Sequence, residues 1–126
     1  MDHEAIWAPL TVLAFLAARF FPFELLNLGP CPWRMMTGVP CPTCGGTRAM
    51  MALARMEIPA ALALNPLVAA AGIAAAVYVV HALGVWLLGW RRWRPSVSSP
   101  GVLMTLRVGA ISVLLLNWAY LVLTGR

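Results

Sequence analysis

The chain carries little charge, and this scarcity excludes most soluble folds. Only 10% of its 126 residues are charged, whereas 62% are hydrophobic. A soluble domain usually carries about 25% charged residues on its water-facing surface. Lysine is absent, so the net charge of +5 comes from nine arginines against four acidic residues. Most of these arginines stand singly at the ends of apolar runs, which is typical of a membrane surface rather than of nucleic-acid binding. We therefore expect a membrane protein that does not bind nucleic acid.

Two further absences narrow the class. The chain has only three cysteines, which cannot all pair with one another, so they do not form a closed disulfide framework. Its first residues, MDHE, lack the positively charged start of a secretory signal peptide. The apolar run that follows is therefore expected to remain as a membrane helix. No internal repeat or low-complexity linker divides the chain, and residues 1–126 are expected to form a single integral membrane domain.

Three apolar runs are long enough to cross a bilayer. A span needs about 20 residues, because each helical residue rises about 1.5 Å and the hydrocarbon core is about 30 Å thick. The runs cover residues 5–23, 66–90 and 102–124. Asn65 and Pro66 predict the start of the second run, since Asn is a favoured N-cap and Pro suits the first helical position. The predicted fold is therefore all-α, a polytopic bundle of about three transmembrane helices.

Polar side chains within these runs are candidates for function. His81 lies in the second run, and Asn117 and Tyr120 lie in the third. Together with Asn65, they are the intramembrane polar residues of the predicted bundle. A polar or ionisable residue in a span is a functional candidate, so His81 and Asn117 suggest a small channel or transport subunit. In the structural alternative, both side chains form hydrogen bonds inside the bundle.

Closely spaced prolines interrupt the chain between the first two runs. Each proline removes a backbone donor and restricts the residue before it. Residues 28–46 are therefore predicted to form a rigid loop that faces water or packs on protein, because irregular backbone in lipid would leave polar groups unpaired. Residues 47–58 read TRAMMALARMEI, a sequence typical of an amphipathic helix. This segment is too short to span, and we expect an interfacial or re-entrant helix.

The cysteines of this loop carry candidate metal chemistry. Cys41 and Cys44 have the C-x-x-C spacing that lets two thiolates reach one ion, and Cys31 is a candidate third ligand. Zinc is the ion that such a set suggests, although a structural zinc site has four ligands. His3 is separated from the loop by the first span and His81 lies within the second, so neither is well placed to be the fourth.

The same pair also supports a redox interpretation. A C-x-x-C pair at a helix N-terminus has a lowered thiol pKa, because the helix dipole stabilises the thiolate. Gly45 and Gly46 supply a loose backbone before the helix, Thr47 can cap its first turn, and Arg48 adds positive charge nearby. In a third interpretation the cysteines are small buried residues of a structural loop that binds a partner.

The loop motif resembles the signature of a known family. CPWR at residues 31–34, TG at 37–38 and CPTCGGTRA at 41–49 resemble the C-P-x-C-G-x-T-R pattern of a domain-of-unknown-function family of small bacterial membrane proteins. The pairs Asn65-Pro66 and Asn117-Trp118 look like other recurring pairs of that family. The resemblance implies a compact helical bundle in the bacterial inner membrane, and it implies no activity. It places the expected functional positions at Cys31, Cys41, Cys44, Gly45, Thr47 and Arg48.

The distribution of charge bears on orientation and completes the prediction. Asp2 and Glu4 precede the first span, and Arg19 lies at its far end. By the positive-inside rule this distribution favours a cytoplasmic cysteine loop. The arginines at 91, 92 and 94 argue for the opposite orientation.

We expect a non-enzymatic protein of the bacterial inner membrane whose loop binds a metal ion or a partner. A membrane thiol oxidoreductase or redox sensor is the alternative. Expected partners are the lipid bilayer and a second copy or another membrane protein.

Overall fold

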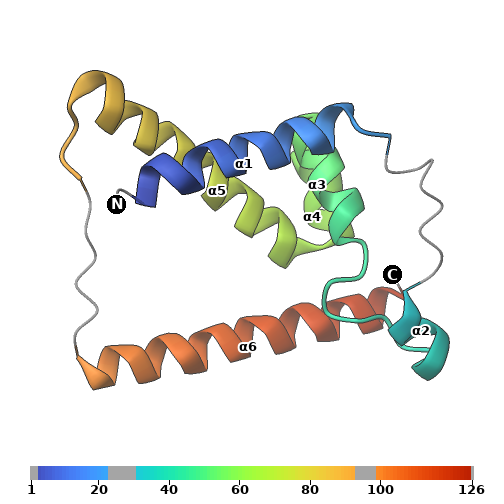
Figure 1. Cartoon of the computed structure of the whole chain (residues 1–126). Coiled ribbons are helices and arrows are strands. Elements are labelled where there is room, and N and C mark those ends of the chain that lie inside the picture. Colours follow the sequence, from blue (N-terminus) through green and yellow to red (C-terminus); the bar gives the residue numbers. More distant parts are fainter. Residues whose placement is uncertain (1–2, 23–30, 93–98, 126) are drawn as a thin grey trace.

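The structure is a computed structural model that describes residues 3–22, 31–92 and 99–125. Its regular elements are all α-helices, and the described residues contain no strand (Figure 1). The all-α prediction is therefore confirmed. In chain order the helices are α1 His3–Phe20, α2 Pro32–Thr37, α3 Gly46–Ala54, α4 Ile58–Leu64, α5 Pro66–Leu88 and α6 Pro100–Thr124.

Two of these helices, α5 and α6, are long and apolar enough to cross a membrane. They have 23 and 25 residues, which correspond to about 35 Å and 38 Å at 1.5 Å per residue. The first predicted span corresponds to α1, whose apolar part Ala5–Phe20 is shorter. The described part of the chain thus contains two candidate spans by length and composition, and a third apolar helix of lesser length.

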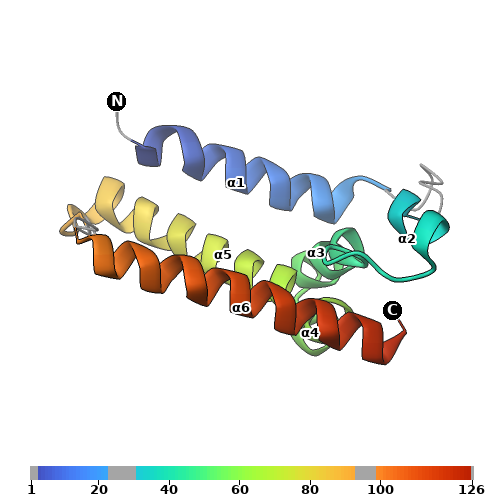
Figure 2. The same ribbon diagram turned by 90° about the horizontal axis from the view of Figure 1, so that it is seen from below.

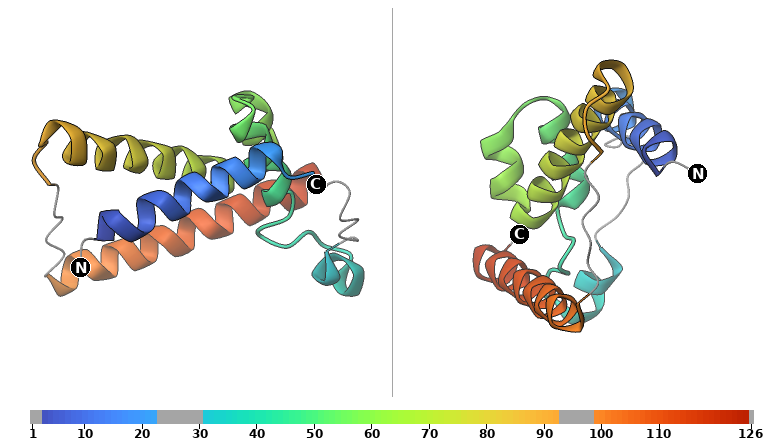
Figure 3. Two further views of the ribbon diagram at one scale, coloured as in Figure 1. Left: turned by 45° about the horizontal axis from the view of Figure 1, so that its top comes forward. Right: turned by 90° about the vertical axis from the view of Figure 1, so that its left-hand side faces the viewer.

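The three long helices run beside one another, and the short helices gather at one end of them (Figure 2). That end is where α1 finishes, α5 begins and α6 finishes. Figure 3 shows α6 set apart from the group formed by α1, α3, α4 and α5. The burial pattern agrees, because Asn117 and Leu121, both near the end of α6, are its only buried residues among those described. The cysteine segment lies at this same crowded end.

A small, alanine-rich core joins α3, α4 and α5. Its buried members are Ala52, Leu53, Ala61 and Ala69, and Phe15 of α1 packs against them. Small side chains allow helix backbones to approach closely. Because such a core buries little apolar surface, it contributes modest packing energy, and polar contacts gain importance in holding the helices together.

The helix predicted over residues 47–58 is divided in the structure. α3 ends at Ala54, Met56 adopts a left-handed φ of 65°, and α4 begins at Ile58. Pro59 is the physical reason, because in a continuous helix its ring would clash with the carbonyl of Arg55. Placed at the start of α4, the proline meets no such clash, since a first-turn N–H has no helical partner.

The loop predicted over residues 28–46 contains one short helix, α2. Pro32 occupies the first position of this helix, where its missing N–H costs nothing. α2 ends at Gly38, which has a left-handed φ of 72°. The spacing between Pro32 and Pro40 is therefore wide enough for one helical segment. Residues 28–30 lie outside the described part of the chain.

The ends of the long helices follow local signals. Asn65 is the N-cap of α5, and its side chain accepts a hydrogen bond from the Val68 amide, which confirms the predicted cap. Gly89, with a φ of 64°, ends α5 one residue after Leu88. α6 begins at Pro100, two residues before the predicted start, because proline is favoured in the first turn. α1 ends at Phe20, and Phe23 of the predicted span lies outside the described residues.

Close packing of α3 on α5 makes Gly72 a test of the fold. A Cβ atom at Gly72 would clash with Leu53 Cδ2 and would lie 3.1 Å from Met50 Sδ. Gly72→Leu is therefore expected to lower the free energy of unfolding by about 1–3 kcal/mol through overpacking. Gly109→Leu on α6 is the matched control, since nothing lies within 4 Å of its added Cβ. Both variants gain the same helix propensity. Thermal unfolding in detergent measures the difference, and equal midpoints would contradict the packing.

Candidate metal centre

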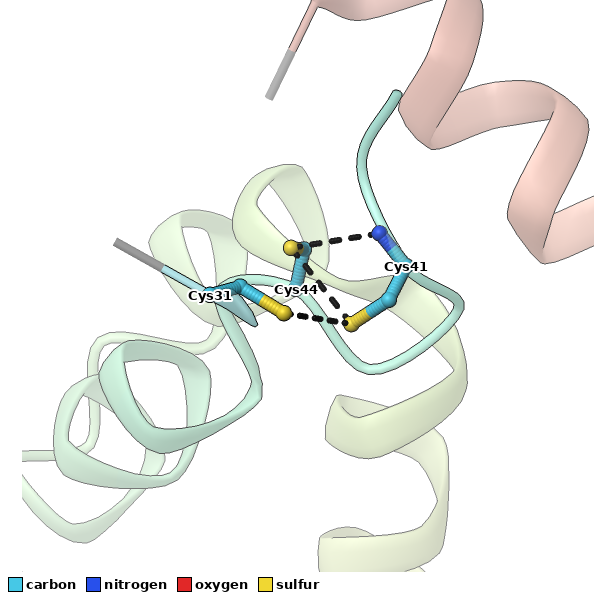
Figure 4. Close-up of side chains that lie close together, drawn as sticks. All are labelled: Cys31, Cys41 and Cys44. Carbon is cyan, nitrogen blue, oxygen red and sulfur yellow. Dashed lines mark hydrogen bonds between the residues drawn. The ribbon is translucent and has the colours of Figure 1, made fainter. Parts of the chain in front are cut away.

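The three cysteines form one cluster, although Cys31 is ten residues from Cys41. Cys31 immediately precedes α2, and Cys41 and Cys44 belong to the turn before α3. The sulfur of Cys41 lies 3.5 Å from the sulfur of Cys31 and 3.5 Å from that of Cys44 (Figure 4). All three sulfurs lie within 4.8 Å of one another, and all three residues are half-buried free thiols. The cluster therefore joins two segments of the chain.

Local backbone geometry brings Cys41 and Cys44 together. The Cys44 amide donates to the Cys41 carbonyl at 3.0 Å, and the Gly46 amide donates to the Thr43 carbonyl at 2.9 Å. Gly45 then adopts a left-handed φ of 76° as the N-cap of α3. A Cβ at Gly45 would also lie 3.3 Å from the Leu64 carbonyl oxygen. Glycine is required here, because a side chain would add both backbone strain and a close contact.

Side chains from distant helices bind the carbonyl groups of this turn. Asn65 Nδ2 donates to the Pro42 carbonyl at 3.2 Å and to the Cys44 carbonyl at 3.1 Å. Asn117 Nδ2 donates to the same Pro42 carbonyl at 3.0 Å. Trp118 Nε1 donates to the Pro40 carbonyl at 2.8 Å. The turn is thus attached to the start of α5 and to the end of α6.

The electrostatic environments of Cys41 and Cys44 differ. A hydrogen bond with the Thr43 hydroxyl, at 3.3 Å, is the main cause that lowers the pKa of Cys41 from 9.0 to about 7. Hydrogen bonds with Cys31 and with Cys44 add to this effect, while burial opposes it. Burial raises the pKa of Cys44, mainly by desolvating its thiolate. At neutral pH, a larger fraction of Cys41 than of Cys44 is therefore in the thiolate form.

The difference in pKa between Cys41 and Cys44 changes one expectation from the sequence. The helix dipole was expected to favour the thiolate of a cysteine just before the helix. In the structure the lowered pKa belongs to Cys41, and its main cause is the neighbouring Thr43 hydroxyl. A side-chain hydroxyl at hydrogen-bonding distance stabilises a thiolate more directly than a dipole that begins beyond Gly45.

The arrangement of the sulfurs fits a thiolate-bound metal ion. With metal–sulfur bonds of about 2.3 Å, two sulfurs of a tetrahedral zinc site lie about 3.8 Å apart. The observed separations of 3.5 Å and the limit of 4.8 Å bracket that value. The Cys41 amide also donates to the Cys44 sulfur at 3.3 Å, a type of contact that stabilises a metal-bound thiolate. The three cysteines could therefore hold a metal ion.

The remaining candidate residues of the loop lie close to the cluster without adding a ligand. Gly46 allows close approach to α5, since a Cβ there would lie 3.3 Å from Val68 Cγ2. Thr47 and Arg48 are exposed in the first turn of α3. The N-cap of α3 is Gly45, so Thr47 does not cap the helix as the sequence suggested.

The polar residues of the long helices separate into two groups. Asn65 and Asn117 donate hydrogen bonds to the Pro42 carbonyl of the turn, and the Tyr120 hydroxyl donates to the Ala63 carbonyl at 3.1 Å. His81 does not belong to the cluster. Its ring packs at 6.5 Å from the ring of Trp90. Each of these side chains has a neighbour within the protein.

Two contributors to the site were not among the candidates from sequence. Thr43 acts on Cys41, and Trp118 holds the Pro40 carbonyl. Thr43 could have been identified by its position inside the C-x-x-C pair, where its hydroxyl is necessarily near a sulfur. Trp118 carried no local signal, because its partner lies 78 residues earlier in the chain.

Comparison with known proteins gives a match to one family model over part of the chain. Residues 31–80 match the family model described as a protein of unknown function, DUF2752. This match confirms the resemblance to a domain-of-unknown-function family. The matched segment contains the whole cysteine cluster and Asn65, and it ends within α5. Neither the curated proteins nor the solved structures contain a match to the chain.

The lowered pKa of Cys41 predicts a specific pH dependence. A thiol reacts as its thiolate, so the alkylation rate rises as the pH increases through the pKa. We expect Cys41 to react with iodoacetamide with a midpoint near pH 7, and Cys44 to react only at higher pH. Thr43→Val is expected to move the Cys41 midpoint toward 9.0, because it removes the main stabilising contact. Peptide-resolved mass spectrometry gives each rate.

Thr37→Val is the control for this experiment. The Thr37 hydroxyl donates to the Trp33 carbonyl within α2 at 2.7 Å, and it has no sulfur partner among the described contacts. Its loss should leave the Cys41 midpoint unchanged. A Thr43→Val protein with the parental midpoint would show that Thr43 does not set this reactivity.

Proposed function

We propose that the protein is a non-enzymatic integral membrane protein whose three cysteines form a metal-binding centre, with zinc as the expected ion. The observation that carries this proposal is the convergence of three sulfurs within 4.8 Å from two separate segments. A redox C-x-x-C pair has no need of Cys31. A thiolate-rich metal site does, because its affinity increases with the number of thiolate ligands.

Each residue of the cluster has a definable part in this function. Cys31, Cys41 and Cys44 would hold the ion, and a bound zinc ion would link α2 to the turn before α3 and contribute folding energy. Thr43 favours the thiolate form of Cys41, which binding requires because only the deprotonated sulfur is a ligand. A water molecule, a partner chain or a further side chain would complete the coordination.

The membrane arrangement follows from the long helices. In the proposed topology α5 and α6 cross the bilayer, and α1 is a third span whose 18 residues extend about 27 Å. The cysteine cluster then lies at one membrane surface, at the end shared by the three helices. The family resemblance supports the bacterial inner membrane. The flanking charges of the first span support a cytoplasmic position for the loop.

Metal content tests the function directly. Protein purified under reducing conditions with zinc is expected to contain about one ion per chain, measured by elemental analysis. Cys31→Ser, Cys41→Ser and Cys44→Ser are each expected to lose that ion, because each removes one thiolate ligand. Thr37→Val is the matched control outside the cluster and should retain it. Parent protein without stoichiometric metal would refute the metal-binding function.

A thiol redox role is the second candidate, and the low pKa of Cys41 favours it. In this role the Cys41 thiolate and the Cys44 thiol, 3.5 Å apart, would form a disulfide. The pair would lose two electrons and one proton to a disulfide oxidant, which would be reduced to one thiol and one thiolate. The Cys31→Ser variant distinguishes the candidates. It would keep reversible oxidation by glutathione disulfide in the redox role, whereas it would lose the ion in the metal-binding role.

Orientation is tested by labelling in intact cells. With the loop in the cytoplasm, a membrane-impermeant maleimide is expected to label the cysteines only after the membrane is permeabilised. Chelator and reductant are present in both samples, so that neither metal nor oxidation masks the thiols. Labelling of intact cells would place the loop outside, where the surroundings favour disulfides over reduced metal ligands.

A further inference from the structure

The turn that carries Cys41 and Cys44 depends on side chains that come from elsewhere in the chain. The carbonyl groups of Pro40, Pro42 and Cys44 each accept at least one hydrogen bond from a distant side chain. Prolines at 40 and 42 have no N–H, so this backbone cannot form a regular ladder of its own hydrogen bonds. The position of the cysteine backbone therefore depends on these distant donors as well as on the local hydrogen bonds of the turn.

Asn65 and Asn117 have the same double role in this arrangement. Their Oδ1 atoms accept from the first-turn amides of α5, Asn65 from Val68 at 3.1 Å and Asn117 from Leu67 at 3.0 Å. Their Nδ2 atoms both donate to the Pro42 carbonyl. Asn65 is fully buried and Asn117 is 5% exposed. Each amide thus connects the start of α5 to the cysteine turn, in a place where water cannot substitute for it.

Asn117 also connects the turn to α6. The preceding part of α6, residues 100–116, is exposed throughout. The hydrogen bonds from α6 to α4, to α5 and to the cysteine turn come from its end, from Asn117, Trp118 and Tyr120. Two of these three residues bind the cysteine turn. The end of α6 is therefore part of the wall of the site, although it contributes no sulfur ligand.

We propose that Asn65 and Asn117 are positioning residues that set the spacing of the three sulfurs, so that the docked end of α6 completes the cysteine centre. This inference rests on the proposed function of the cluster and adds the residues that prepare it for the ion. The amides do not touch the ion. They act by holding the carbonyls of Pro42 and Cys44, and hence the direction of the sulfurs of Cys41 and Cys44.

If Asn65 and Asn117 only stabilised the fold, their loss would affect folding and not specifically the sulfur spacing. Serine substitutions separate this structural role from the positioning role. Asn65→Ser keeps a favoured N-cap for α5, because a serine hydroxyl also accepts from the third amide of a helix. Serine is too short to reach Pro42 and Cys44 as well. Asn117→Ser removes the corresponding bonds from α6. Tyr120→Phe is the matched control, since it deletes the bond from α6 to Ala63 and leaves every bond to the turn intact.

Arsenite binding by the full-length protein in detergent measures the sulfur spacing without a resident metal. One As(OH)₃ reacts with three thiols to form an As(S)₃ adduct and three waters, with no change of oxidation state. Intact mass spectrometry counts the adduct. Asn65→Ser and Asn117→Ser are expected to weaken arsenite binding by about 10–100-fold, the usual effect of losing a partner that orients a ligand. Zinc affinity should fall in parallel, while helical circular dichroism and Tyr120→Phe should match the parent.

The outcomes distinguish this proposal from the proposed function. Parent protein that binds arsenite but no zinc, with weakened arsenite binding in both serine variants, would support the positioning role and refute the metal-binding function. Serine variants with parental arsenite affinity would refute the positioning role. Equal losses in the serine variants and in Tyr120→Phe, in proportion to lost helicity, would show a general folding role and would also overturn the proposal.

Discussion

The hydrogen bonds of two buried asparagines to the cysteine turn are the interactions on which the rest of the structure depends. A proline-rich turn next to apolar helices has carbonyl groups that neither a helix nor a sheet can satisfy, and a buried unpaired carbonyl costs about 1–3 kcal/mol. Asn65 and Asn117 satisfy these groups and at the same time bond two free amides at the start of α5. The same hydrogen bonds thus hold the cysteine turn, the first turn of α5 and the end of α6 in place relative to one another.

This constraint explains why the chemistry lies at one end of the three long helices. The core of α3, α4 and α5 is built mainly of alanine and is small. Among helices surrounded by lipid, apolar burial does little to drive association, so packing and hydrogen bonds decide how helices pair. The polar contacts of α6 are concentrated beside the cysteines, and the rest of that helix is exposed. Two of the side chains that attach α6 to the other helices are consequently also side chains of the site.

Some features were predictable because their causes are local. The apolar runs predicted the long helices, and Asn65-Pro66 predicted the cap of α5, since both depend on residues within one helical turn. The short helix α2 and the division between α3 and α4 were not predicted, although their causes are also local. The closely spaced prolines of the loop were read only as helix breakers, and Pro59 was given no role. Pro32 and Pro59 each stand in the first turn of a new helix.

The sequence by itself determined that the chain is helical and apolar, and that Cys41 and Cys44 are neighbours, because a C-x-x-C turn with glycine after it has few conformations. Only the tertiary structure decided that Cys31 joins them, that Thr43 acts on Cys41, and that Asn117 binds the carbonyl of Pro42, 75 residues earlier. Periodicity and spacing report the geometry within one segment. Contacts between segments depend on how helices dock, and here two amide side chains determine that docking.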